Sequence, residues 1–367
     1  MKVLEISFFD PNGKDRAGVE RYINKLKKQF ESQGDKVTVV SITFNKYIKS
    51  SDIQIYVNPI LRRLGLAKII YNIKLFYYLS KNKNLYDVVH INGDNGVFIP
   101  YIFGCKTVMT LHGSMTETVL LKKKESKIKF NMSYILDRID GYLEVNACKK
   151  SNAVIAVSSH LRDYFSKCAN RSDIMVVNTC IDPPKEVKKD NIHNFQQILN
   201  PKRLVCLWVG RDPVRKGLKI AKDAVRGLSD VTLITAGFMD PEQNTNIINL
   251  GFVEDEILNV IYYSSDVFLF PSSAEGFSAA ALEAMSYGLI PIVSDIPPFR
   301  ELIDDGKNGF LVKTEDMYKE RLIWLLNNVE KMNKIRLEAL ETTKRFYCSS
   351  LLPIVYNKFK EISSQRS

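Results

Sequence analysis

The sequence predicts an α/β protein with two doubly wound parallel-sheet domains that face each other. Its 367 residues exceed the usual size of a single hydrophobic core. Short, continuous apolar runs alternate with amphipathic helical patterns, which is typical of parallel strands that are buried on both faces. This alternation stops at a polar segment after Asp182-Pro183-Pro184 and then starts again, so two α/β units are expected.

The apolar runs place the elements along the chain. In a first domain, residues 1–185, buried strands are expected at 3–9, 36–43, 87–92, 107–113, 153–159 and 174–178. Amphipathic segments such as 18–32 supply the crossover helices. The polar segment 186–200 is interpreted as a linker. In a second domain, residues 201–348, strands are expected at 204–210, 231–237, 267–273 and 290–295. The tail, 349–367, has the pattern of a helix that crosses back to the first domain.

Charge is distributed unevenly. The net charge is +11, but residues 1–200 carry 31 Lys+Arg against 19 Asp+Glu, whereas residues 201–367 carry 21 against 22. A basic half suits an anionic partner, yet no nucleic-acid reader motif is present, so nucleic acid is not expected. No stretch reaches about 18 uninterrupted apolar residues, so a membrane-spanning helix is not expected either.

The cysteines and histidines show no metal-binding or disulfide spacing. The six cysteines are scattered without a CxxC pair, which favours reduced thiols and a cytoplasmic location. The four histidines have no ligand spacing, so no metal site is expected.

The segment PSSAEGFSAAALEAMSYG, residues 271–288, has the most specific pattern. A strand leads into a turn at Glu275-Gly276, and Ser278 is a suitable N-cap for a helix that ends at Gly288. Free backbone amides at the start of such a helix bind anions. The glycine and the alanines have small or no side chains, so a ligand can approach the backbone closely. The alternative is a buried alanine helix with two solvated acids.

A second loop, GRDPVRKG at 210–217, follows the first strand of the second half. Its arginines offer planar guanidinium groups and Lys216 a compact ammonium group, and both suit the phosphate oxygens of a diphosphate. The alternative is a solvated basic turn. The loop lacks the GKS or GKT ending of a P-loop, which disfavours nucleoside triphosphate hydrolysis.

Two weaker signals lie in the first half. RAGVERYI, 16–23, puts Gly18 at the opening of the first helix, where its backbone can approach a phosphate. TLHGSM, 110–115, puts His112 at a strand end, where parallel sheets bind ligands. Taken alone, a tight turn explains the glycine and a structural role explains the histidine.

These segments together resemble a known family. Glu275 and Glu283 in EX7E spacing, the GRDPVRKG turn, the AGVERY glycine, the His112-Gly113 pair and PIVSDIPPFRELIDDGKNGFLV are similar to the retaining nucleotide-sugar glycosyltransferases of family four, also described as glycosyl transferases group 1. The resemblance covers nearly the whole chain and is strongest from about 204 to 313. It implies the GT-B fold, in which two Rossmann-like domains face a central cleft.

The resemblance also implies residue roles. Glu283 would hold the ribose of the donor nucleotide, Glu275 the hydroxyls of the transferred sugar, and His112 would contact that sugar. Arg211 and Lys216 would neutralise the diphosphate, helped by backbone amides. The implied catalytic residues are Glu275, His112, Arg211 and Lys216, and the implied substrate-binding residues are Gly18, Gly276, Phe277, Ser278, Ala279 and Glu283.

The implied activity is transfer of a hexose, with retention, from a UDP- or GDP-sugar to a glycan or lipid-linked acceptor in bacterial-type surface polysaccharide or glycoconjugate synthesis. No cofactor or metal is needed, because fixed cations and amides stabilise the departing diphosphate. Two alternatives stay open: an epimerase or phosphorylase on the same fold, and a catalytically silent partner subunit. The sugar and the acceptor are not readable from one sequence.

A basic amphipathic stretch, 61–83, is the candidate for membrane contact. Helical spacing gathers apolar and aromatic side chains on one face, with Arg63, Lys74 and Lys81 beside it, and residues 122–130 add lysines. Such a surface suits the inner face of an anionic membrane. The alternative is that the apolar face packs on the sheet of its own domain.

Overall fold

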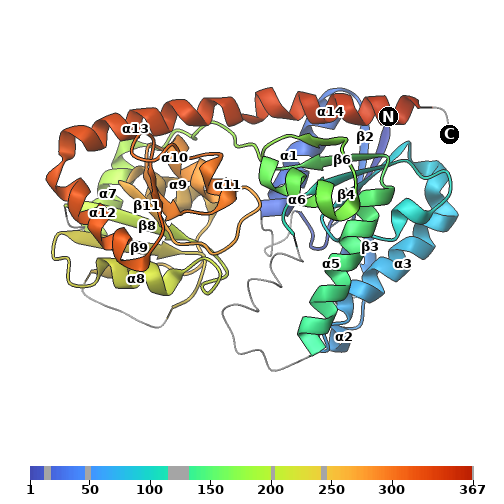
Figure 1. Ribbon diagram of the computed structural model, residues 1–367, viewed down its shortest axis with the longest axis horizontal. Coiled ribbons are helices and arrows are strands. Elements are labelled where there is room, and N and C mark those ends of the chain that lie inside the picture. Colours follow the sequence, from blue (N-terminus) through green and yellow to red (C-terminus); the bar gives the residue numbers. More distant parts are fainter. Residues whose placement is uncertain (12–17, 46–50, 115–131, 200–202, 241–245, 366–367) are drawn as a thin grey trace. The chain divides into compact units, whose positions relative to one another are not determined.

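The computed structural model describes residues 1–11, 18–45, 51–114, 132–199, 203–240 and 246–365 (Figure 1). The chain divides into two units. Unit 1 comprises Met1–Cys180 and Cys348–Ser367, and unit 2 comprises Ile181–Tyr347. The short, continuous apolar runs form parallel strands in both units, so the predicted doubly wound α/β architecture is confirmed.

Unit 1 contains a parallel sheet of seven strands within the described residues, in the order β3-β2-β1-β4-β5-β6-β7. The strands are β1 (Lys2–Ile6), β2 (Lys36–Thr43), β3 (Ile53–Tyr56), β4 (Val88–Asn92), β5 (Thr107–Leu111), β6 (Ala153–Ala156) and β7 (Ile174–Val176). The strand order reverses between β1 and β4, which pair with Glu5 opposite His90. Ligands of open α/β sheets bind at the carboxyl ends of the strands at such a point.

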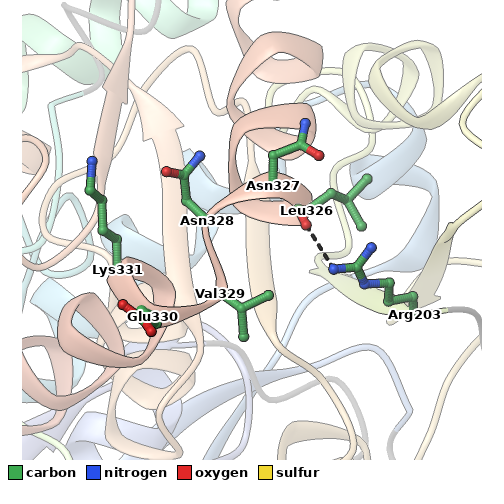
Figure 2. A pocket seen from close by; sticks show the side chains of 7 residues that line it. All are labelled: Arg203, Leu326, Asn327, Asn328, Val329, Glu330 and Lys331. Atoms are coloured by element: carbon green, nitrogen blue, oxygen red, sulfur yellow. Dashed lines mark hydrogen bonds between the residues drawn. The ribbon is translucent and has the colours of Figure 1, made fainter.

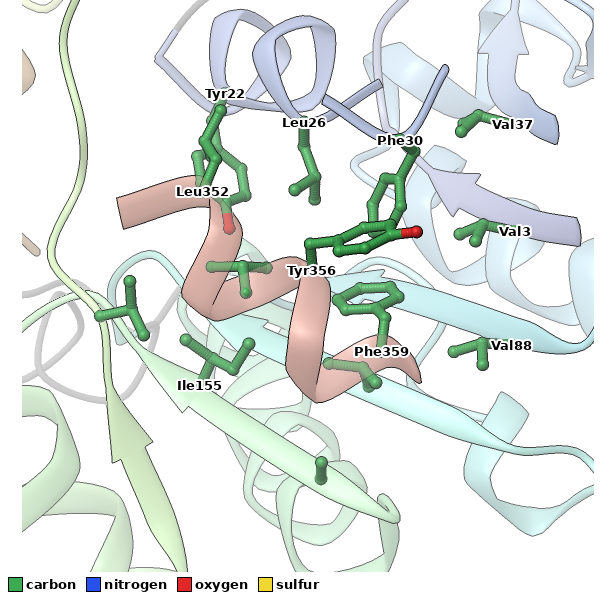
Figure 3. Close-up of a cluster of buried hydrophobic side chains, with 14 of the residues drawn as sticks. Val3, Tyr22, Leu26, Phe30, Val37, Val88, Ile155, Leu352, Tyr356 and Phe359 are labelled. Carbon is green, nitrogen blue, oxygen red and sulfur yellow. The ribbon is translucent and has the colours of Figure 1, made fainter. Parts of the chain in front are cut away.

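Helices pack around this sheet. The described helices of unit 1 are α1 (Gly18–Ser32), α2 (Pro59–Arg63), α3 (Ala67–Asn82), α5 (Met132–Lys150), α6 (Ser159–Ala169) and α14 (Cys348–Ser364). Figure 3 shows α14 packed on the sheet beside α1: Tyr356 and Phe359 lie with their rings 5.3 and 5.0 Å from that of Phe30. The tail of the chain therefore completes the core of the unit in which the chain begins.

Unit 2 repeats the design. Its described strands are β8 (Leu204–Val209), β9 (Val231–Ala236), β10 (Ile247–Asn249), β11 (Val267–Phe270), β12 (Ile290–Ser294) and β13 (Phe310–Val312), in the order β10-β9-β8-β11-β12-β13. All of these pairs are parallel. The order reverses between β8 and β11, so the loops that follow these two strands flank the expected ligand position.

The helices of unit 2 include one in the expected linker. They are α7 (Lys189–Leu199), α8 (Leu218–Val225), α9 (Asp255–Tyr263), α10 (Ala279–Ser286), α11 (Pro297–Arg300), α12 (Glu315–Asn327) and α13 (Val329–Thr343). Residues 186–200, interpreted as a linker, thus contain α7, which belongs to unit 2. The helix was not predicted because the segment is largely polar, with apolar residues on only one side of the helix.

The expectation that the cysteines are reduced is wrong for one pair. Cys180 and Cys348 form a disulfide within unit 1, with their Cα atoms 4.9 Å apart. They lie 168 positions apart, so no local spacing announces the pair. Cys180 is the last residue before the chain enters unit 2, and Cys348 is the first after it returns. The cytoplasmic location, which was inferred from reduced thiols, loses that support.

We expect reduction of this disulfide to destabilise the protein by about 2–4 kcal/mol, because the crosslink restricts the unfolded chain. Alkylation of the denatured protein should label four thiols without reductant and all six with it, matching the four free cysteines. The denaturant midpoint should fall for Cys180→Ala, while Cys168→Ala, at an exposed free thiol, should leave it unchanged. Six labelled thiols without reductant would contradict the crosslink.

No helix in the described part of the chain is long and apolar enough to cross a membrane.

Candidate functional site

Two loops meet at the point of unit 2 where the strand order reverses. The first, Gly210–Gly217, joins β8 to α8, and the second, Pro271–Ser278, joins β11 to α10. Gly217 has a φ of +65°, and a Cβ there would lie 2.1 Å from the carbonyl oxygen of Pro271. Only glycine allows this approach, so the backbones of the two loops pack directly against each other.

Hydrogen bonds hold the first loop in place. The Trp208 indole N–H donates to the carbonyl oxygen of Lys216 at 2.9 Å, and the Ser273 amide donates to the carbonyl oxygen of Arg215 at 2.8 Å. Because Trp208 is fully buried, the backbone of Arg215 and Lys216 is anchored to the core.

A carboxylate and two cations meet where the loops touch. Glu275 Oε1 accepts hydrogen bonds from Arg215 Nη1 at 3.2 Å and from Ser272 Oγ at 2.9 Å, and lies 3.9 Å from Lys216 Nζ. Arg215 also donates to the carbonyl oxygen of Ala274 at 2.6 Å. The Glu275 side chain is only 11% exposed, so its orientation is fixed by these contacts.

Lys216 is the more buried of the two cations. Its side chain is 17% exposed, and its Nζ lies 4.7 Å from the ring centre of Phe270. The pKa of Lys216 is lowered, mainly because the side chain is buried, although the charges of Glu275 and Glu283 act to raise it. Two cations with limited access to water attract an anion more strongly than a solvated pair would.

The helix α10 begins as the sequence predicts. Ser278 is its N-cap, and its hydroxyl oxygen accepts a hydrogen bond from the Ala281 amide at 3.3 Å. Helix geometry leaves the first amides of α10 without partners inside the helix. Glu283 lies on this helix, half-buried, and its charge acts on Lys216. Phe277 is buried, with its ring 5.4 Å from that of Phe346, which fixes the turn before the helix.

Of the remaining predicted residues, two lie on these loops and two lie on unit 1. Arg211 is exposed on the β8 loop, and Gly276 lies in the β11 loop beside Glu275. His112 follows β5 in unit 1, where its Nε2 lies 3.0 Å from Oδ1 of Asn92. Gly18 is the first residue of α1, and a Cβ there would meet no described atom within 4 Å. The candidate residues therefore form two sets, one on each unit.

Comparison with known proteins identifies the chain. The family model "Glycosyltransferase Family 4" matches residues 16–185, and "Glycosyl transferases group 1" matches residues 189–342. The chain belongs to glycosyltransferase family 4.

Relatives of this glycosyltransferase match it over most of their length. A phosphatidyl-myo-inositol mannosyltransferase of Mycobacterium leprae is 23% identical, over 95% of this chain and 94% of that protein. A GDP-mannose:cellobiosyl-diphosphopolyprenol alpha-mannosyltransferase of Xanthomonas oryzae is 28% identical, over 62% of this chain and 61% of that protein. The crystal structure of Anabaena HepE in complex with UDP and glucose matches with a TM-score of 0.77 and 18% identity, over 98% of this chain and 100% of that one. The expected GT-B fold is confirmed.

Two residues that the structure places in contact with the candidate residues were not singled out by sequence reasoning. The sequence offers Arg215 only as one of the cations of the GRDPVRKG loop, whereas the structure pairs it with Glu275. Asn92, which contacts His112, carries no sequence signal, because a single asparagine at a strand end is common. Only the register of β4 and β5 brings the two side chains together.

The basic stretch 61–83 differs from its expected form. Gly65, with a φ of +73°, separates α2 from α3, so Arg63 does not share a helix with Lys74 and Lys81. The buried face of α3 consists of Ala67, Tyr71, Asn72, Leu75 and Leu79. Several large apolar side chains stay exposed instead, namely Ile60, Leu64, Ile73, Phe76 and Tyr77. Packing on the sheet therefore explains only part of the apolar content. Residues 122–130 lie outside the described residues.

A hollow in unit 2 has no part in this site. Figure 2 shows it at the junction of α12 and α13, lined by Arg203, Leu326, Asn327, Asn328, Val329, Glu330 and Lys331. Arg203 precedes β8, so the hollow lies at the amino end of that strand, whereas the two loops follow the carboxyl ends. Its polar lining is already partly satisfied, since Arg203 donates to the carbonyl oxygen of Leu326 at 3.0 Å.

Proposed function

We propose that this glycosyltransferase transfers a hexose, with retention, from a UDP- or GDP-sugar to a glycan or lipid-linked acceptor. One observation carries the proposal: at the point where the strand order of unit 2 reverses, Glu275, Arg215 and Lys216 lie together in the loops that precede α8 and α10. Cations and helix amides at such a point suit a diphosphate.

The proposed roles follow the chemistry of each group. Lys216 and Arg211 neutralise the diphosphate, together with the backbone amides of Phe277 to Ala279. As the bond from the sugar to the diphosphate breaks, negative charge grows on the leaving oxygen, and fixed donors stabilise it without reorganising. Glu283 binds the ribose, and Glu275 orients the sugar. Departure and attack then take place on the same face of the sugar, which gives retention.

Both nucleotide classes have support among similar proteins. The Anabaena structure holds UDP and glucose, and the Xanthomonas relative is named for GDP-mannose. A panel of UDP- and GDP-sugars therefore tests the proposal, with slow hydrolysis of the donor as the reaction followed. We expect one donor to release its nucleotide and a sugar of retained anomeric configuration, seen by NMR, and EDTA to leave the rate unchanged.

Other outcomes of this assay would favour the alternatives. An epimerase converts the donor without releasing nucleotide, and a phosphorylase depends on inorganic phosphate. A silent subunit turns over no donor at all. Release of an inverted sugar would contradict retention, and loss of activity in EDTA would contradict the metal-independent mechanism.

A membrane-bound acceptor is the second part of the proposal. Two relatives are named for lipid or polyprenol acceptors. In this chain Tyr77, 62% exposed on α3, lies against the Lys81 ammonium at 4.4 Å, and α2 carries Arg62 and Arg63 in its last turn. Exposed aromatic and apolar groups beside cations suit the interface of an anionic membrane. The protein would bind the inner face of that membrane.

We expect the protein to float with phosphatidylglycerol-containing liposomes at low salt and less so at high salt, because salt screens the cationic contribution. Tyr77→Ser with Ile73→Ser should reduce the bound fraction severalfold. Leu337→Ser, which replaces a 66%-exposed leucine of unit 2, is the matched control and should bind as the wild type does. No flotation at either salt concentration would contradict the membrane contact.

A further inference from the structure

Polar side chains are buried beneath His112 in unit 1, and the roles proposed above do not use them. Glu5 on β1, His90 and Asn92 on β4, and Thr110 on β5 are each at most 1% exposed. Register explains why they meet: Glu5 pairs with His90, and Asn92 pairs with Thr110. Burying so many polar groups costs free energy unless they are hydrogen-bonded, so their bonds define what the cluster does.

One end of this cluster is closed. His90 Nδ1 lies 2.6 Å from Glu5 Oε2, and His90 Nε2 lies 2.7 Å from Thr110 Oγ1. Both ring nitrogens of His90 therefore have partners inside the core. This leaves Asn92 as the link between the cluster and His112.

The amide of Asn92 can point only one way. Its Nδ2 donates to the carbonyl oxygen of Ile6 at 3.1 Å and to Glu5 Oε2 at 3.3 Å. A carbonyl oxygen accepts and never donates, so the nitrogen end of the amide must face Ile6. The oxygen end then faces His112 Nε2 at 3.0 Å, and it too can only accept. The hydrogen between them must belong to His112 Nε2.

His112 stays neutral in this environment. Burial, and then the charge of His90, lower its pKa to about 3. The Tyr22 ring of α1 covers it edge-on, with the ring centres 5.0 Å apart, and Asn92 links it to Glu5. A neutral imidazole with its hydrogen on Nε2 keeps a lone pair on Nδ1. Among the described residues, no hydrogen bond to Nδ1 is present.

We propose that Asn92, held by Glu5 and the Ile6 carbonyl, is a positioning residue that fixes His112 as the Nε2–H tautomer, so that Nδ1 accepts a hydrogen bond from a sugar hydroxyl. This inference rests on the proposed function. It also defines a specificity: a hydroxyl has a hydrogen to donate to Nδ1, whereas a carboxylate of a uronic acid has none and would face a lone pair. The sugar group that contacts His112 Nδ1 is therefore a hydrogen-bond donor such as a hydroxyl, and not a carboxylate.

The tautomer is measurable without any substrate. With four histidines in the chain, long-range ¹H–¹⁵N spectra of ¹⁵N-histidine-labelled protein resolve each ring. We expect His112 in the wild type to show a protonated Nε2 and a bare Nδ1, with no titration between pH 5 and 8, well above its lowered pKa. In Asn92→Ala the fixed acceptor is lost, so the two tautomers should mix.

The kinetic arm separates positioning from folding. For the donor that the wild type hydrolyses, Asn92→Ala should lower kcat/KM by about 10- to 100-fold, because a misplaced contact stabilises the transition state less. The Kd for UDP or GDP should stay unchanged. Asn152→Ala is the matched control: it removes two part-buried hydrogen bonds with Thr107, at the other end of β5, and should keep wild-type kinetics.

The outcomes are distinguishable. An Nδ1–H tautomer, or titration of His112 near the ordinary pKa of histidine, in the wild type would overturn this inference, and that result needs no folded variant. Wild-type kinetics in Asn92→Ala would overturn it as well. Failure of the wild type to bind any UDP- or GDP-sugar would instead overturn the proposed function, and the tautomer of His112 would remain as measured.

Discussion

Glu275→Gln should lower kcat by about 10²- to 10³-fold, the usual cost of removing one preorganised polar group from a transition state. Glutamine has nearly the same shape, so the turn should persist, but it lacks the charge that Arg215 and Ser272 hold in place. Removing an anion beside Lys216 does not weaken the binding of another anion. The Kd for UDP or GDP should therefore stay the same or fall.

Glu283→Ala is the informative partner of that variant. It removes the carboxylate proposed to bind the ribose, and hydrogen bonds to charged groups contribute roughly 1.5–3 kcal/mol, which corresponds to about 10- to 100-fold in Kd. Calorimetric titration with UDP and GDP, beside steady-state kinetics, measures both effects. Equal losses of nucleotide affinity in the two variants would contradict the division of roles between the two acids.

Lys216→Met should weaken nucleoside diphosphate binding by about 10- to 100-fold and lower kcat as well, because the same cation faces the diphosphate in the ground state and in the transition state. Methionine keeps the apolar length that packs on Phe270, so the loop should stay folded. Lys219→Met is the matched control. Lys219 lies in the first turn of α8, directly after the loop that contains Lys216, but its side chain is 88% exposed and pairs with Asp223 at 2.9 Å.

The lysine control separates local from general electrostatics. Each lysine variant loses one positive charge, so a general effect of net charge would weaken binding equally in both. A surface pair such as Lys219–Asp223 contributes little in water. If Lys219→Met loses as much affinity for UDP or GDP as Lys216→Met, the assignment of Lys216 to the diphosphate is wrong.

Much of the fold was predictable, because buried strands announce themselves as apolar runs. The runs at 36–43, 107–113 and 204–210 contain β2, β5 and β8. The strands β3, β10 and β13 were missed, since each has three or four residues and lies at a sheet edge, where burial is partial and the apolar run is short. The disulfide and the break at Gly65 were missed because distant pairing and a single glycine leave no local pattern.

The candidate site was predictable only where one segment contains it. The turn at Glu275, the N-cap at Ser278 and the helix α10 follow each other in sequence, so spacing and capping rules apply directly. The bond from Arg215 to Glu275 spans 60 positions, and that from His112 to Asn92 spans 20. Such contacts depend on strand order, which places loops side by side and which no single segment encodes.

The central claim is that unit 2 binds a nucleoside diphosphate sugar at the β8 and β11 loops. A thermal-shift panel of UDP, GDP and their sugars tests it most directly, since a ligand that binds only the folded state adds about 2.7 kcal/mol at a concentration one hundred times its Kd. We expect at least one nucleotide class to raise the melting temperature of the wild type, and the shift to shrink in Lys216→Met but not in Lys219→Met. If no nucleotide or nucleotide sugar in the panel raises the melting temperature, the donor assignment is wrong.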